Sequence, residues 1–509
     1  MALEPSAKPR ARCFTTLLTL LSISSIGLLI FNIIAFPIVF QDLVNTQVVL
    51  KNGTLSFTQW INPTPKIYKI VTVYNVTNTV EVAVGGQPII DPIGPYYFRE
   101  YREKIDVGVV YDQEVWFSEK KYYIFDNETT NKDRPANATL DPTKDKFTTF
   151  NLAYIGVAYN LTCSGAPSTE ILEAVIAALA EHEEALFMSN HTVQEVLFGY
   201  KDPFLTVLRV KMPDLPDTVQ IVYNMSDQDI TTRSKVWNGQ KDVSLLGQYS
   251  EWQGYTSLPW WGSAEANTVN GTEGLFFAPN VDKTKTLTTW TDDLFRSSQM
   301  EFVEEEMMLG MNTYKYHIPK FALLNATNNP LNAGFYSFCP NGLMNLTAAV
   351  SAPVFASKPS FMDGEPWLLE EVTGLPPADL ATMDTNIWVE PTTGALVKAI
   401  KQLQVNVMIQ QTKKFPKLDK LRIEPRYVPV ALVLETGGMD DDLATTFKDS
   451  VFKPRRIFVI IIWVLLGLVV ALSVLFGGLL FRHIRVNQSE DSTKLIIPAN
   501  PEDQIYANN

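Results

Sequence analysis

The sequence predicts an α+β membrane protein in which two transmembrane helices, one near each end, flank a large ectodomain. Two observations predict the membrane helices and their placement: residues 14–40 and 457–481 are long apolar runs without charge, and ten Asn-x-Ser/Thr sequons lie between them. A third observation predicts the mixed class, because strand-like segments precede and follow a helix-like stretch within residues 41–456.

The two apolar runs are long enough to cross a bilayer, which takes about 20 residues in a helix. Residues 14–40 contain Asn32 and Pro37, but both lie near the end of the run that faces the ectodomain. The alternative for this run is a cleaved signal peptide, whose apolar part usually has about 7–15 residues. Because the run is longer than that, we expect an uncleaved anchor.

The sequons predict which side of the membrane each segment occupies, because glycosylation takes place only on the lumenal or extracellular side. We therefore expect residues 41–456 to lie outside the cytosol, and residues 1–13 and 482–509 to lie within it. A further sequon at Asn487 would then stay unmodified. The predicted glycosylation sites are Asn52, Asn75, Asn127, Asn137, Asn160, Asn190, Asn224, Asn270, Asn325 and Asn345.

Composition limits the partners and the covalent bracing of this chain. A net charge of −13 argues against nucleic acid as a partner. Of three cysteines, Cys163 and Cys339 lie in the predicted ectodomain and could form a disulfide in an oxidising compartment. Cys13 lies at the cytosolic edge of the first span, where it is either a palmitoylation site or an unmodified thiol.

Strand-like segments open and close the ectodomain. Residues 66–76 and 106–117 are rich in β-branched and aromatic side chains, and Asn52-Gly53 within residues 47–57 is a hairpin signal. Residues 403–409 alternate apolar and polar side chains, which predicts a strand with one buried face, and residues 428–435 continue the pattern.

The middle stretch is helix-like. Residues 167–170 (Pro-Ser-Thr-Glu) resemble a helix start, and apolar residues then recur at helical spacing as far as Leu186. A second helix is expected over residues 191–200. We place this helical region at about residues 150–205.

Several phrases then resemble the class B scavenger receptor family, and in particular its lysosomal integral membrane protein type 2 branch. They follow the family's order along the chain and stand between the same two spans. The phrases are QVVLKNGTLSFTQW (47–60), DPIGPYYFREYRE (91–103), HTVQEVLFGYKDP (191–203), WQGYTSLPWW (252–261), VNGTEG (269–274), NAGF (332–335) and EPTTGALVKAIKQLQVNV (390–407).

The resemblance implies an antiparallel β-barrel core with a helical-bundle apex, and an apolar tunnel that leads toward the bilayer. It also implies lipid or lipoprotein ligands, such as sterol, fatty acid or phospholipid, passed to the membrane through that tunnel. The alternative within the family is a trafficking receptor that escorts a lumenal hydrolase to lysosomes. Either protein would sit in the endosomal or lysosomal membrane, with the plasma membrane as the second choice, and could form homo-oligomers.

The predicted apex is acidic, since residues 147–200 contain no Lys or Arg. The resemblance implies lysines in the corresponding helix of family members that scavenge. The electrostatic field at this apex would therefore have the opposite sign. The segment is either a solvated helix face or a binding surface for a basic or neutral partner. In the second case we expect partner binding to weaken on acidification. The residues of this candidate surface are Leu179, Glu181, His182, Glu183, Glu184 and Leu186.

The cytosolic tail carries a candidate sorting motif. Asp491, Leu495 and Ile496 fit the pattern acid-x-x-x-Leu-Leu/Ile, which clathrin adaptors bind in an extended, accessible tail. The motif favours endosomes and lysosomes.

Catalytic and metal-binding patterns are weak, and we expect neither an enzyme nor a cofactor. The sequence lacks a P-loop and a Gly-x-Ser-x-Gly motif, and its four histidines are scattered. A two-span ion channel is a further alternative, disfavoured because few cysteines are present to brace its ectodomain.

Overall fold

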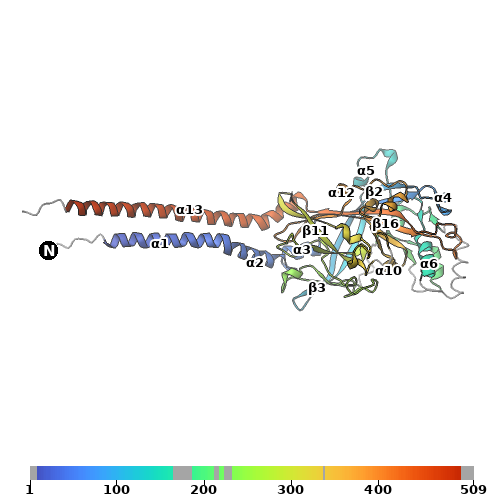
Figure 1. The fold of residues 1–509 in the computed structure, drawn as a ribbon, viewed down its shortest axis with the longest axis horizontal. Helices are drawn as coiled ribbons and strands as arrows, with labels where there is room; N and C mark the ends of the chain where they lie inside the picture. Colours follow the sequence, from blue (N-terminus) through green and yellow to red (C-terminus); the bar gives the residue numbers. More distant parts are fainter. Residues whose placement is uncertain are drawn as a thin grey trace, which may run out of the picture. The chain divides into compact units, whose positions relative to one another are not determined.

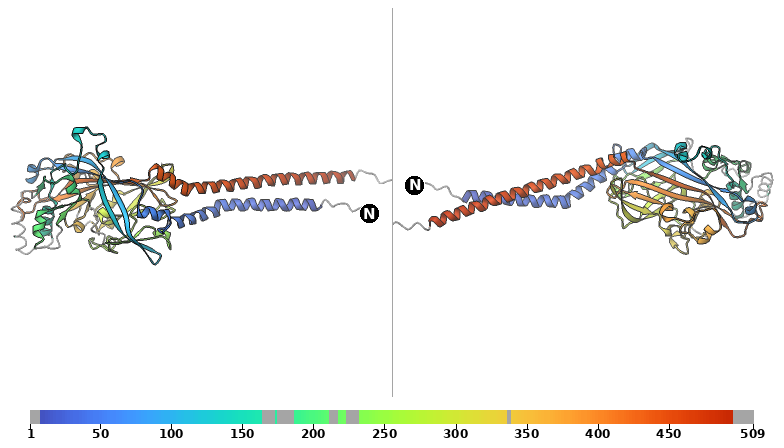
Figure 2. Two further views of the ribbon diagram at one scale, coloured as in Figure 1. Left: turned by 180° about the vertical axis from the view of Figure 1, so that it is seen from behind. Right: turned by 90° about the horizontal axis from the view of Figure 1, so that it is seen from above.

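The fold is seen in a computed structural model that describes residues 8–163, 173, 186–210, 217–222, 232–335 and 339–494. The chain divides into two units: residues 1–44 together with 445–509, and residues 45–444. Figures 1 and 2 show the helices of the first unit and the sheet of the second.

The first unit is built from the two apolar segments. Helix α1 (Lys8–Ile30), a π-helical turn (Phe31–Ala35) and helix α2 (Phe36–Val48) contain the first predicted span, while α13 (Asp441–Lys494) contains the second. Both helices are long and apolar enough to cross a membrane, and only 11% and 6% of their most apolar stretches are buried. Such exposed apolar surface suits a lipid environment.

The wide turn in the first segment has a local cause. Pro37 has no N–H and its ring crowds the carbonyl of the preceding turn. The backbone widens there, and the N–H of Phe36 donates to the carbonyl of Phe31, five residues back. The Phe36 ring stacks on Phe458 of α13 with 4.6 Å between ring centroids, so the two segments contact each other within this unit.

The second unit is an antiparallel sheet whose path runs β10-β11-β12-β15-β16-β17-β1-β2-β3-β8-β9. The strands of this path are β1 (Ile67–Val76), β2 (Ile90–Val110), β3 (Glu114–Phe125), β8 (Ser234–Trp237), β9 (Tyr249–Glu251), β10 (Leu287–Thr291), β11 (Arg296–Met308), β12 (Met311–His317), β15 (Asn386–Val389), β16 (Leu396–Ile409) and β17 (Arg426–Gly438). Figure 2 shows the orange strands β16 and β17 beside the blue strands β1 and β2.

A short segment between the two ends of this path nearly closes the sheet into a barrel. Thr272 bridges Gln248, next to β9, on one side and Thr289 of β10 on the other. The backbone amides of Tyr249 and Trp290 donate to the carbonyls of Gly271 and Thr272, at 2.9 Å and 2.7 Å. The sheet edges at this point are therefore paired, which confirms the predicted barrel core.

Smaller elements cover the barrel and its ends. Strands β13 (Leu343–Asn345) and β14 (Val354–Ser357) pair with each other, and β14 also pairs with β16. Two short sheets join β4 (Thr149–Phe150) to β5 (Phe187–Met188) and β6 (Tyr200–Lys201) to β7 (Thr218–Val219). The remaining helices are α3 (Leu55–Ile61), α4 (Thr79–Ala83), α5 (Asn127–Asn131), α6 (Leu152–Cys163), α8 (Val193–Phe198), α9 (Pro203–Leu208), α10 (Thr347–Val350), α11 (Pro366–Glu370) and α12 (Leu380–Met383).

The helices α6, α8 and α9 pack on one end of the barrel (Figure 1). Tyr154 of α6 and Phe204 of α9 share a buried apolar cluster with Val430 of β17. The predicted helix at 191–200 is confirmed in a shorter form, since α8 begins after Thr192, whose side chain and that of Glu195 form a capping box. The predicted helix start at 167–170 lies outside the described residues.

Two strand predictions are wrong in detail. Residues 47–57 are not a hairpin, because α2 extends to Val48, Asn52-Gly53 forms the connecting turn with Gly53 at φ +93°, and α3 begins at Leu55. Residues 106–117 are not one strand, because β2 turns into β3 at residues 111–113. Both segments have strand-like composition, but a turn or a helix cap at one position overrides it.

The strand predicted at 403–409 is confirmed as part of β16, but the prediction that its polar face is exposed is wrong. Gln404 and Asn406 are fully buried, and the Gln404 side chain accepts from the backbone amide of Ser360 at 2.9 Å. Asn406 donates to the Ser357 hydroxyl at 3.0 Å and accepts from Gln404 at 2.8 Å. The polar residues of this strand therefore form a buried hydrogen-bond network.

The substitution Asn406→Ala should lower the free energy of unfolding by about 1–3 kcal/mol, because it leaves buried partners without a hydrogen bond. Urea unfolding of the purified protein measures the change, with exposed Lys414→Ala as the matched control. Equal midpoints for the two variants would contradict the buried network.

Candidate functional site

Most of the predicted apex surface cannot be located in the structure. Leu179, Glu181, His182, Glu183 and Glu184 lie outside the described residues. Leu186 is described and is buried in the apolar cluster beneath α6, where its carbonyl accepts from the amide of Asn151. Leu186 is therefore a core residue, and the rest of the apex surface stays a prediction.

The sorting motif is described only in part. Asp491 lies in the last turn of α13, while Leu495 and Ile496 fall outside the described residues. The helix reaches Lys494, so the expectation of an extended tail is wrong for residues 482–494. The adaptor-binding role of the motif stays a prediction.

The cysteines are also described in part. Cys13 is exposed and free on α1, and palmitoylation there stays a prediction. Cys339 is a free, buried thiol whose pKa burial raises to about 12. Its pairing with Cys163 stays a prediction, since the side chain of Cys163 lies outside the described residues.

The predicted glycosylation sites are accessible wherever the structure describes them. The structure describes nine of the ten asparagines, all except Asn224, and none of the nine is buried. Asn52, Asn127, Asn137, Asn190 and Asn270 are exposed. This exposure is compatible with modification, which stays a prediction.

A cluster of charged side chains inside the barrel was not predicted. Side chains of a strand alternate between its two faces, so residues two apart share a face. On β2 the inward row passes from Tyr96 and Phe98 to Glu100, Arg102 and Lys104. The barrel interior therefore changes from apolar to charged along the strands.

On neighbouring strands the inward side chains also change from apolar to charged, at the same level of the barrel. The inward row of β1 changes from Val71 to Lys69, which is 1% exposed, and that of β17 changes from Val433 to Glu435. On β3, Tyr123 is followed inward by Lys121 and Glu119. Because the changes coincide, the charges gather in one layer of the barrel.

Strand register places these charges opposite one another. Glu435 of β17 pairs across the sheet with Lys69 on one side and with Lys401 on the other. Their ammonium groups lie 3.9 Å and 3.5 Å from the Glu435 carboxylate. Arg102 donates to Glu100 and also lies 3.5 Å from Glu435. Glu435 is therefore surrounded by three cations, Lys69, Lys401 and Arg102.

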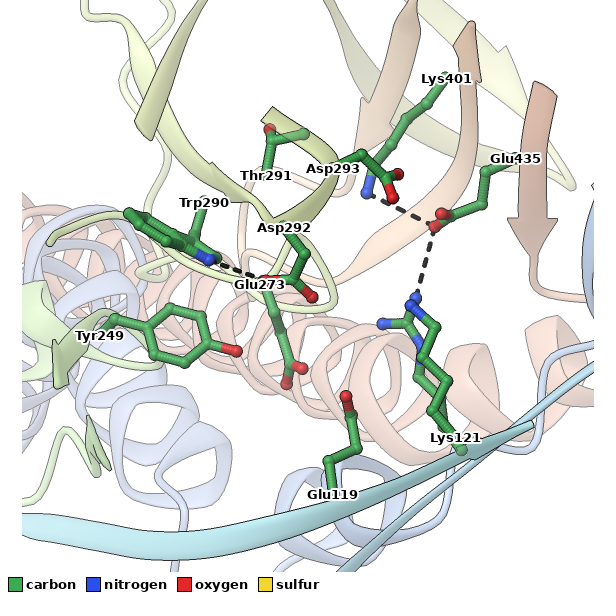
Figure 3. A pocket seen from close by; sticks show the side chains of 11 residues that line it. Glu119, Lys121, Tyr249, Glu273, Trp290, Thr291, Asp292, Asp293, Lys401 and Glu435 are labelled. Atoms are coloured by element: carbon green, nitrogen blue, oxygen red, sulfur yellow. Dashed lines mark hydrogen bonds and ion pairs between the residues drawn. The ribbon is translucent and has the colours of Figure 1, made fainter. Parts of the chain in front are cut away.

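A cavity lies beside this charge layer, and Figure 3 shows its lining side chains. Its cavity volume is about 30 Å³, which leaves room for a few ordered water molecules. Its cationic residues are Arg102, Lys121 and Lys401, and its acidic residues are Glu119, Glu273, Asp292, Asp293 and Glu435. We call this space the charged chamber.

The chamber has two chemically different sides. In Figure 3, Tyr249 and Trp290 lie on one side with Glu273 and Asp292, while Lys401 and Lys121 lie on the other side with Glu435. The indole N–H groups of Trp252 and Trp290 both donate to Oδ1 of Asp292, at 2.9 Å and 2.8 Å. One side is therefore aromatic and acidic, and the other holds cations paired with Glu435.

Several polar groups here have incomplete pairing within the described residues. Glu273 accepts from Lys104 at 2.9 Å through Oε2, but its buried Oε1 has no hydrogen-bond partner. The Lys121 ammonium lies 3.9 Å from Glu100, which is longer than the 2.7–2.9 Å of a strong charge-assisted bond. Both acceptor and donor capacity thus remain in the chamber.

The charge layer shifts several pKa values in opposite directions. Burial acts to raise the pKa of Glu435, but Lys401, Arg102 and Lys69 outweigh it and hold that pKa well below its usual range. For Asp292 burial prevails over nearby Lys121, and its pKa is raised. Glu435 is therefore ionised at lysosomal pH, whereas Asp292 binds a proton more readily than an exposed Asp.

The charged lining differs from the apolar tunnel that the resemblance implies. Lipid chains gain nothing from contact with ionised groups, which would lose hydration on that contact. What the chamber can do chemically is hold ordered water through charge and hydrogen bonding. The sequence did carry a signal for it, since Glu100, Arg102 and Lys104 continue the spacing of Tyr96 and Phe98.

The substitution Glu435→Gln should lower the free energy of unfolding at pH 7 by about 3–5 kcal/mol, because it leaves three cations with less compensation. The wild-type contribution of Glu435 is present above pH 4.5, the ordinary pKa of Glu, and is lost as pH falls through the lowered pKa of the folded state. The variant should therefore also lose less stability than the wild type below pH 4.5. Denaturation curves from pH 7 to 3 measure both effects.

Glu304→Gln is the matched control, since Glu304 is 58% exposed on β11 and pairs with Lys315 at the surface. It should change stability by less than about 1 kcal/mol. An unfolding curve for Glu435→Gln that matches this control at every pH would contradict the charge layer.

Known proteins are similar to this chain in sequence. The CD36 family model matches residues 17–480. The chain is 28% identical to Lysosome membrane protein 2 of Homo sapiens over 480 residues, which is 91% of this chain and 92% of that protein. It is 26% identical to Scavenger receptor class B member 1 of Cricetulus griseus over 454 residues, 88% of this chain and 84% of that protein. The resemblance found in the sequence is confirmed, and this chain belongs to the CD36 family.

Proposed function

We propose that this protein is a two-span scavenger-receptor-type membrane receptor of endosomes and lysosomes. It binds lipid or lipoprotein ligands with its ectodomain and passes lipid to the membrane in which it is anchored. The observation that carries the proposal is the family match across residues 17–480, which includes both apolar helices and the whole barrel.

The barrel supports the lipid role physically. A nearly closed sheet has no long free edge, so it can enclose an interior while remaining a single rigid shell. Its apolar layer contains Val71, Val73 and Phe98, and each CH₂ group of a lipid gains about 0.8 kcal/mol on leaving water for such surroundings. Acyl chains would follow the apolar layer and avoid the charged chamber.

The lysosomal location is supported by the relatives and by the tail. The first relatives compared carry the name Lysosome membrane protein 2. Asp491, Leu495 and Ile496 supply the adaptor motif expected of a protein sorted to that compartment. Relatives named Scavenger receptor class B member 1 keep the plasma membrane as the second choice.

The protein purified in full length from cells should carry bound lipid. Mass spectrometry of its organic extract, compared with an unrelated two-span glycoprotein purified in the same detergent, should show lipid enriched at about one molecule or more per chain. Lipid at the level of the control, together with a co-purified lumenal hydrolase, would reject lipid transfer and leave the escort role.

Leu495→Ala combined with Ile496→Ala should move the protein from lysosomes to the cell surface, because the adaptor loses its apolar contact. Surface biotinylation and imaging against a lysosomal marker measure the shift. Ile497→Ala, next to the motif, is the matched control and should stay lysosomal. Unchanged lysosomal residence of the double variant would reject the motif.

A further inference from the structure

We propose that the turns of two hairpins, β2–β3 and β11–β12, insert apolar side chains into the surface of the bilayer in which the protein is anchored. The barrel would then rest on the membrane at these two turns. The inference does not depend on lipid transfer, since it needs only the membrane spans and the barrel. It rests on the composition of the turns, on their backbone conformation, and on their place at one end of the barrel.

Both turns are apolar, whereas hairpin turns are usually built from Gly, Asn and Asp. Residues 107–111 are Val-Gly-Val-Val-Tyr and residues 307–311 are Met-Met-Leu-Gly-Met, and neither run contains a charge. Tyr111, Val109 and Met307 are 87%, 55% and 67% exposed, so they contribute little to packing within the described residues. Folding of the barrel therefore does not account for apolar side chains at these positions.

The backbone of both turns makes this choice of residues unfavourable. Tyr111 and Leu309 have φ angles of 48° and 50°, in the left-handed region that Gly and Asn adopt most easily. Gly310 follows at φ 74°, and two consecutive positive φ angles in a hairpin favour Asn-Gly over the Leu-Gly found here. Strained positions of this kind gather at functional sites. Because the strained residue is apolar in both turns, the partner of the turns should be apolar too.

The β2–β3 turn lies beside the segment that follows the first span; the long hairpin can be followed in blue and cyan in Figure 2. The amide of Leu50 donates to the carbonyl of Asn238 at 2.9 Å, and the amide of Asn238 donates to the carbonyl of Gln113, in the turn, at 2.8 Å. Leu50 follows Phe40, the end of the first apolar run, by ten residues, most of them in α2. A connection of that kind is about 20 Å long at most, so the chain itself keeps this turn close to the bilayer.

The β11–β12 turn lies at the same end of the barrel. Neighbouring strands are antiparallel along the whole path from β11 to β2, so β2, β11 and β17 have their C-terminal ends together. Just after β17, the amide of Met439 donates to the carbonyl of Val397 at 2.9 Å, at the start of β16. The chain then enters α13, which contains the second span. Both apolar turns and the chain leading to the second span therefore leave the barrel at one end.

The charges around the turns select the kind of bilayer surface. Residues 105–114 and 301–312 contain no Lys or Arg, whereas Asp106, Asp112 and Glu114 flank the first turn and three glutamates at 304–306 precede the second. Anionic lipid attracts basic segments and would repel these acids. Tyr is enriched at membrane–water interfaces, and the flexible side chain of Met fills irregular gaps. The partner is therefore a zwitterionic bilayer, such as one of phosphatidylcholine.

Bromine quenching of the full-length protein in nanodiscs tests the contact. A bimane fluorophore is attached to Tyr111→Cys, Met307→Cys or Val84→Cys in a chain whose exposed Cys13 is changed to Ser, and the chain without an added cysteine gives the blank. Val84 is 62% exposed and follows the C-terminal end of β1, at the opposite end of the barrel, so it is the matched control. In phosphatidylcholine with brominated acyl chains, the probes at 111 and 307 should lose most of their fluorescence, and the probe at 84 should keep its own.

A second set of variants tests whether the apolar side chains hold the contact. In a chain labelled at Val109→Cys, Tyr111→Asn together with Met307→Gln should reduce quenching to the level of Val84→Cys, because the apolar contact with lipid is lost. The chain should remain folded, since Asn suits the left-handed position better than Tyr does, and an unchanged melting temperature in detergent checks this. Val84→Asn is the matched control and should leave quenching at residue 109 unchanged.

Equal quenching at residues 84, 111 and 307 would overturn the proposal. Quenching at residue 109 that persists in the Tyr111→Asn and Met307→Gln chain would also overturn it, since tethering alone would then hold the turn near lipid. Probes at 111 and 307 that are shielded from water but not quenched by bromine would assign the turns to a protein contact instead. A failure of lipid transfer would leave a positive result standing, because quenching reports contact with the bilayer and not transport.

Discussion

Charges that point into a closed sheet have little access to water, and in this protein they have to be compensated by one another. Lys69, Glu100 and Lys104 are 1%, 2% and 3% exposed, and each is on the inner row of its strand. Isolated burial of any one of them would cost several kcal/mol. Register solves the problem, because it sets Glu435 between Lys69 and Lys401 across neighbouring strands. A slip of one residue would turn these side chains to the outer face and break the pairing.

This constraint divides the ectodomain interior into two layers with different roles. The apolar layer beneath α6 and α8 packs as an ordinary core. The charged layer beside Trp290 and Glu273 suits ordered water. The same strands β1, β2 and β17 supply both layers.

The architecture could be predicted from the sequence because its spans and strands are long or periodic features. The spans at 14–40 and 457–481, and the strands at 66–76 and 428–435, each follow from composition over many residues. The prediction failed where a single turn determines the local structure. At Gly53 a turn leads into a helix, and at residues 111–113 a turn separates β2 from β3. It also misjudged Gln404 and Asn406, because a polar residue gives no sign of the distant groups, here Ser357 and the Ser360 amide, that will satisfy it in a buried place.

The charged chamber shows why a site can escape sequence analysis even when its pattern is visible. Glu100, Arg102 and Lys104 alternate with the spacing of an inward face, but charged residues at such spacing usually mark the solvent side of a strand. Only the continuation of Tyr96 and Phe98 on the same face, and the pairing with β3, reverse that interpretation. The residues of the chamber come from strands far apart in sequence, so their proximity follows from topology alone.

An experimental density map of the full-length glycosylated protein near 2 Å resolution tests the central claim most directly. The account predicts a small space bounded by Glu273, Tyr249 and Trp290 on one side and by Lys121 and Lys401 on the other, with density for ordered water inside it. A barrel in which these charged side chains point outward, and apolar side chains fill that layer, would contradict it.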